Sequence, residues 1–70
     1  MRRNLNAQVA KFLRKARGEL SYLQFSKKCG LSPMSLNRIE LGEQKISLDK
    51  LEDVLNKLRI KLSDVFPEEF

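Results

Sequence analysis

Residues 21–42 constrain the fold most, because start and stop signals for two short helices follow one another there. Ser21 is a favoured N-cap residue, and a glutamine three positions later completes a capping box. Gly30 is the residue type that tolerates the positive φ expected just after a helix. Ser32 then caps a second helix, and Pro33 suits its first position, where no N–H is needed. The stretch therefore predicts two helices, at about 21–29 and 32–41, joined by a tight turn.

Apolar residues recur at helical spacing on both sides of this motif, and no segment alternates as a strand would. The stripes are Val9, Phe12, Leu13 and Ala16 in residues 6–17, and Leu48, Leu51, Val54, Leu55 and Leu58 in residues 48–58. Ser47 is the expected cap of the second of these helices. Ser63 is the expected cap of a last short turn, which Pro67 ends. The chain is therefore predicted to be all-α, with five helices.

Length and charge limit the possibilities further. Seventy residues form one domain, residues 1–70, with a modest core. The net charge is +5, but residues 1–45 hold ten Lys or Arg against three Asp or Glu, whereas residues 46–70 hold four against six. The basic part contains the two-helix motif. This asymmetry favours a nucleic-acid surface there, although a solvated basic surface is the simpler alternative.

Several classes of protein are excluded by what the sequence lacks. It has no histidine and a single cysteine, Cys29, which removes zinc sites, disulfides and Cys–His or Ser–His catalysis. We expect Cys29 to be a core residue and the chain to have no enzymatic activity, no metal and no cofactor. No apolar run approaches the roughly 20 residues of a membrane span, and the N-terminus lacks the pattern of a secretory signal. We therefore interpret the chain as a cytoplasmic protein.

Three segments, FLRKARG, FSKKCGLSPMSLNRIELG and ISLDKLEDVLNKLRIKLSDVF, follow a known pattern over roughly residues 9–66. With them the chain resembles the phage-repressor type of helix-turn-helix domain, the xenobiotic-response-element type to which Cro and the lambdoid repressors belong. The resemblance implies a compact five-helix, lambda-repressor-like DNA-binding domain whose motif spans about residues 21–42.

The chain departs from the family pattern at four positions. Tyr22 stands where the family usually has a phosphate-binding glutamine, and Ser26 stands where it has alanine. Glu19 resembles a one-residue insertion. Arg59 replaces the glycine that often follows the fourth helix, and it suits a left-handed C-cap less well. None of these changes alters the predicted fold.

The resemblance implies that the third helix enters the major groove of double-stranded DNA. The residues it would place at the DNA are Tyr22, Ser32, Pro33, Met34, Ser35, Asn37, Arg38 and Lys45. Asn37 suits adenine, Arg38 suits guanine or a phosphate, and Met34 suits a thymine methyl group. Pro33 is equally explained as a helix starter and Met34 as a plain surface residue. Ser35 would bind either a phosphate or its own backbone.

Two further expectations concern charged residues near the motif. The family pairs a glutamate at the position of Glu40 with a basic residue of the first helix. Arg14 is the first candidate partner and Lys15 the second; the alternative is a surface ion pair of little energetic weight. At the N-terminus, residues 1–5, with Arg2 and Arg3, form either a flexible arm that reaches the DNA backbone or a disordered tail.

The leading hypothesis is a sequence-specific transcriptional regulator, such as a Cro-like repressor, that binds operator DNA as a two-fold homodimer through residues near 60–70. It would act by either blocking or recruiting polymerase at a promoter. The alternative is an antitoxin or adaptor that binds a partner protein, such as a toxin, and DNA secondarily. The C-terminal segment LSDVFPEEF would then be the docking segment for that partner.

Overall fold

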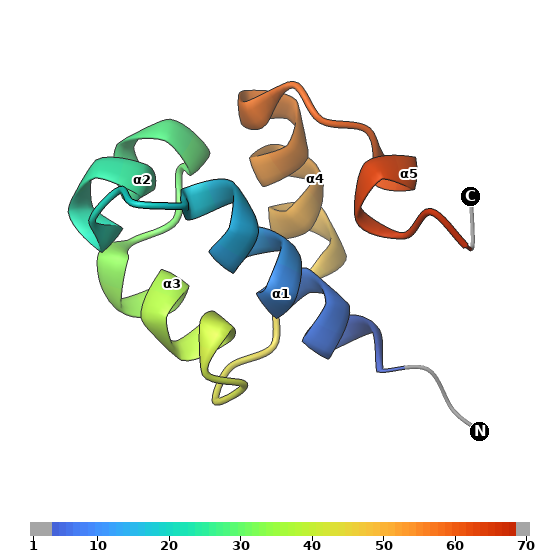
Figure 1. The fold of residues 1–70 in the computed structure, drawn as a ribbon, viewed down its shortest axis with the longest axis horizontal. Coiled ribbons are helices and arrows are strands. Elements are labelled where there is room, and N and C mark those ends of the chain that lie inside the picture. The colour runs from blue at the N-terminus through green and yellow to red at the C-terminus, as the bar shows by residue number, and fades with distance from the viewer. Residues whose placement is uncertain (1–3, 69–70) are drawn as a thin grey trace.

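Five α-helices follow one another along the chain in the computed structural model, which describes residues 4–68 (Figure 1). They are α1 (Leu5–Arg17), α2 (Tyr22–Cys29), α3 (Pro33–Glu40), α4 (Leu48–Leu58) and α5 (Leu62–Val65). No strand occurs between residues 4 and 68. The prediction of an all-α, five-helix fold is confirmed, and the bounds of α4 are those read from its apolar stripe.

The helices pack around one core to which all five contribute. In Figure 1, α1 crosses the centre of the molecule, α2 and α3 lie together on one side, and α5 lies on the other. The core consists of Val9, Leu13, Phe25, Cys29, Leu31, Leu36, Ile39, Leu51, Val54, Leu55, Val65 and Phe66. Cys29 is fully enclosed, with no exposed surface, as expected for a small apolar residue. The two-helix motif is therefore anchored by its own inner faces, Phe25 on α2 and Leu36 on α3.

Side-chain caps fix where the first four helices begin. Ser21 Oγ accepts a hydrogen bond from the Gln24 N–H at 3.1 Å, and Gln24 Oε1 accepts one from the Ser21 N–H at 2.9 Å, which completes the predicted capping box. Ser47 Oγ accepts from the Lys50 N–H at 3.1 Å in the same way. Each such cap is worth about 1 kcal/mol. These local signals are the reason that the motif could be located from sequence.

The N-terminal prediction was wrong in its extent. Asn4 Oδ1 accepts a hydrogen bond from the Ala7 N–H at 3.0 Å, so α1 begins at Leu5 and residues 4–5 are not part of an arm. Arg2 and Arg3, on which the arm hypothesis rests, lie outside the described residues.

Three other predictions about packing and capping were also wrong. Ala16 is exposed and Ala10 is buried instead, because α1 is rotated so that Val9, Ala10 and Leu13 face inward. Leu48 is 83% exposed, since it sits at the very start of α4 beyond the edge of the core. Ser63 does not cap α5; the Asp64 carboxylate accepts the Lys61 N–H at 3.1 Å.

The end of α4 carries a left-handed residue that is not glycine. Arg59 has φ 57° and ψ 45°, and it is the one non-glycine residue with positive φ among residues 4–68. The Ile60 N–H donates to the Leu55 carbonyl at 2.9 Å across this turn, which closes the helix. Arginine therefore adopts the left-handed C-cap conformation that it suits less well than glycine, at some conformational cost. None of the described helices is long and apolar enough to cross a membrane.

Candidate nucleic-acid interface

The tight turn between α2 and α3 sets the angle at which α3 leaves the core. Gly30 has φ 83° and ψ 3°, a left-handed conformation that glycine adopts without strain, and its N–H donates to the Ser26 carbonyl at 2.9 Å. The next residue, Leu31, is buried, so the chain is pinned to the core directly after the turn. Ser32 Oγ then accepts the Ser35 N–H at 3.1 Å, and Pro33 begins α3. The predicted helix–turn–helix geometry is present.

One side of α3 is buried and the other faces solvent. Leu36, Ile39 and Glu40 are buried against the core. Of the predicted DNA-binding residues, the exposed ones are Ser32, Pro33, Met34, Arg38 and Lys45, and the half-buried ones are Tyr22, Ser35 and Asn37. Seven of these eight lie on α3, at its cap or in the loop that follows it, and the eighth, Tyr22, begins α2. Their position is compatible with a common DNA-facing surface.

Glu40, at the end of α3, is a buried carboxylate that joins α3 to α1 and α2. Arg17 donates to both of its oxygens, from Nε to Oε2 and from Nη2 to Oε1, each at 3.0 Å. The Tyr22 hydroxyl donates to Oε1 at 3.3 Å, and the Arg17 guanidinium lies 4.2 Å from the centre of the Tyr22 ring. The Glu40 side chain is 2% exposed, so this is not a surface ion pair. A two-point contact of this kind fixes direction as well as distance.

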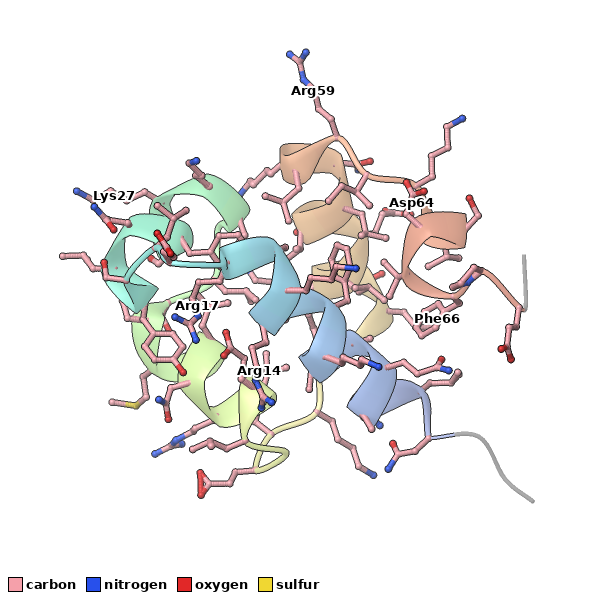
Figure 2. The ribbon with its side chains drawn as sticks, in the orientation of Figure 1. Arg14, Arg17, Lys27, Arg59, Asp64 and Phe66 are labelled. Atoms are coloured by element: carbon pink, nitrogen blue, oxygen red, sulfur yellow. The ribbon has the colours of Figure 1, made fainter. Side chains whose placement is uncertain are left out.

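The prediction that Glu40 pairs with a basic residue of the first helix is confirmed, but Arg14, the first candidate, forms a longer ion pair than Arg17 does. Arg14, whose side chain is 61% exposed, lies 3.9 Å from the carboxylate and donates its hydrogen bond to the backbone carbonyl of Glu40 at 2.8 Å. Lys15 is exposed on another side of α1. Arg17 makes the close pair because it continues the inward row of Val9 and Leu13 at four-residue steps. Figure 2 shows Arg14 and Arg17 both reaching from α1 toward α3. The four-residue spacing was the available sequence signal.

The charge of Arg17 is secured by this arrangement. The hydrogen bonds to Glu40 raise the pKa of Arg17 above its usual value, and the nearby carboxylate charge adds to the effect, while burial opposes it. A raised pKa stabilises the fold as long as the pH stays below it. Arg17 is therefore charged throughout the range in which proteins work.

Cationic residues surround this surface. Arg38 and Lys45 are exposed on α3 and in the following loop, and Arg14 and Lys11 line a groove between α1 and the end of α3. Lys27 is exposed at the far end of α2 (Figure 2). Glu43 is the acidic exception in the loop. A patch of this sign attracts phosphate groups at long range.

Two exposed apolar residues lie on this surface, on the side of the third helix where helical spacing in the sequence groups Met34, Arg38 and Leu41. Met34 is 65% exposed and Leu41, seven positions later, is 61% exposed, with Arg38 between them. Spacings of four and seven residues place all three on one outward face of α3 and its C-cap. The structure adds that this row is exposed, whereas Leu36, Ile39 and Glu40 on the other side of α3 are buried.

Within residues 4–68 no three His, Cys, Asp or Glu side chains are grouped as a metal site would require. A family model described as "Helix-turn-helix" matches residues 11–65, which is most of the chain. The search of curated proteins found no match to the chain.

Proposed function

The chain belongs to the helix-turn-helix family, a DNA-binding and regulatory family, and from this premise we propose that it is a sequence-specific transcription regulator that places α3 in the major groove of operator DNA. The carrying observation is the solvent-facing side of α3, where Met34, Asn37 and Arg38 lie opposite the buried Leu36 and Ile39. Within the family we place the chain in the phage-repressor type. The five-helix layout and the buried glutamate that joins α3 to α1 support this.

The side chains of α3 divide into two roles in this proposal. Arg38 forks onto guanine, Asn37 pairs with adenine, and Met34 contacts an apolar base edge. The polar groups around the helix bind the sugar–phosphate backbone and carry no sequence information. These backbone-binding residues are Tyr22, Ser32, Ser35 and Lys45. Pro33 starts the helix and lies close to the bases.

In-vitro selection from a random DNA pool tests the proposal directly. We expect enrichment of a palindrome with half-sites about one helical turn apart, since one short helix reads few base pairs. Absence of any enriched sequence would reject specific recognition.

Arg38→Ala then tests the assignment of the main reader. On the selected site we expect a loss of about 1–3 kcal/mol per contact and a relaxed preference at one base pair. On random DNA we expect a smaller loss. Equal losses on both would make Arg38 a phosphate contact. Repeating the selection with this variant would show which base pair has lost its preference.

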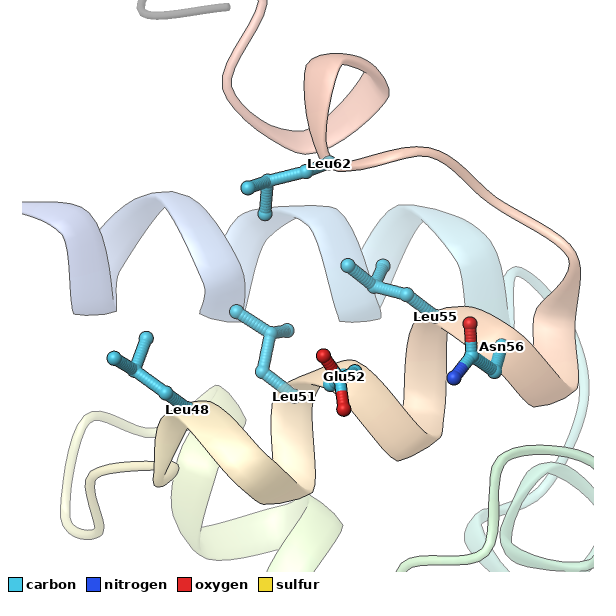
Figure 3. A pocket seen from close by; sticks show the side chains of 6 residues that line it. All are labelled: Leu48, Leu51, Glu52, Leu55, Asn56 and Leu62. Atoms are coloured by element: carbon cyan, nitrogen blue, oxygen red, sulfur yellow. The ribbon is translucent and has the colours of Figure 1, made fainter.

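We further propose that the regulator is a two-fold homodimer joined through the groove between α4 and α5. This groove, about 330 Å³ in volume, has the buried Leu51 and Leu55 as its floor and the exposed Leu48 and Leu62 at its rim (Figure 3). Leu48 protrudes next to the groove, so a two-fold axis would let Leu48 of each copy fill the groove of the other. Leu62 lies in the predicted 60–70 segment; residues 69–70 lie outside the described part.

A substitution at Leu48 tests this arrangement. Leu48→Lys is expected to give a monomer by sedimentation and weaker operator binding. The helical circular dichroism should not change, because Leu48 is 83% exposed. A dimer that survives this change would place the interface elsewhere.

The same groove supports the alternative, an adaptor or antitoxin that docks a partner protein. Leu48 and Leu62 would then cover an apolar segment of a toxin or polymerase, and operator binding would be secondary. Sedimentation of the purified chain separates the two functions. A stable dimer that binds one operator favours the regulator, whereas a monomer with its groove open favours the adaptor.

A further inference from the structure

The beginning of α3 offers apolar surface where a DNA-reading helix ordinarily offers hydrogen-bonding groups. Pro33 and Met34 are both exposed, and Met34 has 65% of its surface in contact with solvent. A large flexible apolar side chain at that exposure contributes nothing to the core. It lies in the same outward row as Arg38, one turn further along the helix.

The two side chains that open this helix offer almost no hydrogen-bonding capacity. Ser32 Oγ accepts the Ser35 N–H at 3.1 Å in the helix cap, and its O–H is left as a donor for the sugar–phosphate backbone. Pro33 has no N–H, and the Met34 side chain has no donor and only a weakly accepting thioether. A base edge that faces the first turn of α3 therefore meets carbon and sulfur atoms from Pro33 and Met34.

The major groove displays one apolar group, the C5-methyl of thymine, and 5-methylcytosine carries the same group at the same place. Resting on the proposed function, we propose that Met34, flanked by the Pro33 ring, is a specificity-determining residue that selects a C5-methylated pyrimidine in each half-site. Met34 and Arg38 are four residues apart, a rise of about 6 Å. The selected pyrimidine therefore lies within about two base pairs of the one that Arg38 reads.

Replacement of single methyl groups in the DNA tests the inference. The probe is the palindrome obtained by selection, in which each thymine of one half-site is exchanged in turn for uracil, which differs only by the C5-methyl. We expect one position at which uracil weakens binding of the unaltered protein about fourfold, equivalent to about 0.8 kcal/mol for one methyl-sized group. At that position 5-methylcytosine should bind more tightly than cytosine, by a similar factor, which separates the methyl group from the rest of the base.

Two variants identify the residue responsible. In Met34→Ala the ratio between thymine and uracil should fall to about one, and the fold should be unaffected because Met34 is exposed. Leu41→Ala is the matched control: it removes a comparably exposed apolar side chain from the same row, 61% exposed, and should leave the ratio unchanged.

Each result decides one point. Equal binding of thymine and uracil throughout an enriched operator would overturn the inference and leave the proposed function intact. A methyl preference that persists in Met34→Ala would overturn the assignment to Met34. If selection enriches no sequence at all, the proposed function and this inference fail together.

Discussion

At the scale of single residues, the feature with the widest influence is the buried carboxylate of Glu40. A buried charge is tolerated only when it is paired and hydrogen-bonded. Here Arg17 supplies two hydrogen bonds and Tyr22 a third, and the Tyr22 ring lies against the guanidinium. The tyrosine that replaces the expected glutamine therefore has a structural role that the sequence did not predict. Its hydroxyl contacts Glu40, and its use by a phosphate group remains a prediction.

Removing one arginine or the other should have very different effects on stability. Arg17→Ala leaves the Glu40 carboxylate buried without its main partner, and we expect the Tm to fall by at least about 10 °C. Arg14→Ala removes a largely exposed side chain and one hydrogen bond to a backbone carbonyl. The expected fall is less than about 5 °C. Thermal unfolding followed by circular dichroism measures both.

A double variant tests whether the Tm lost in Arg17→Ala comes from leaving Glu40 buried without its partner. Arg17→Met combined with Glu40→Leu replaces the ion pair by apolar groups, and it should restore much of the Tm lost in Arg17→Ala. A larger loss from Arg14→Ala than from Arg17→Ala would contradict the pairing seen here.

At the scale of elements, local chemistry made the helices predictable. Ser21, Ser32 and Ser47 cap the helices they were expected to cap, because a cap depends on three or four neighbouring residues. The cap expected of Ser63 and the start of α1 were local errors, and the others concern contacts between distant segments. The rotation of α1, which exposes Ala16, and the close pairing of Glu40 with Arg17 both depend on how the helices cross. The outward face of α3 was predictable because Leu36 and Ile39 identify the buried face, and the outward face lies opposite.

The C-cap of α4 provides a test of backbone strain. Arg59 has φ 57°, where a side chain costs roughly 1 kcal/mol that glycine does not incur. Arg59→Gly is expected to raise the free energy of unfolding by about 0.5–1 kcal/mol, seen as a higher urea midpoint with an unchanged slope. Arg59→Ala is the control, since it removes the charge and keeps the Cβ atom. Equal gains from both variants would show that the arginine charge, and not the backbone, is responsible.

At the scale of the whole molecule, charge is separated along the chain. The basic excess belongs to residues 1–45, which include α2, α3 and the start of the next loop, whereas α4 and α5 lie in the acidic part. In Figure 1, α5 lies on the side of the molecule away from α2 and α3. The basic residues should therefore both accelerate association with DNA and orient the protein so that the helix–turn–helix motif approaches the DNA first.

Salt dependence should identify which cations touch phosphate. Lys45→Ala is expected to reduce the slope of log K against log salt by about 0.9 per subunit and to weaken binding alike on all sequences. Lys61→Ala removes the same charge at the start of α5, on the side of the molecule away from α2 and α3, and should leave the slope nearly unchanged. Identical slopes for Lys45→Ala and the unaltered protein would remove Lys45 from the interface.

The enclosed thiol of Cys29 makes the opening rate of the fold measurable. It is the single cysteine of the sequence, and it has no exposed surface in the closed fold. A thiol reagent can therefore react only when the packing between α2 and its neighbours opens. The labelling rate then reports how often this packing opens, without any introduced probe. Slower labelling in the presence of operator DNA would measure how far DNA binding suppresses the opening.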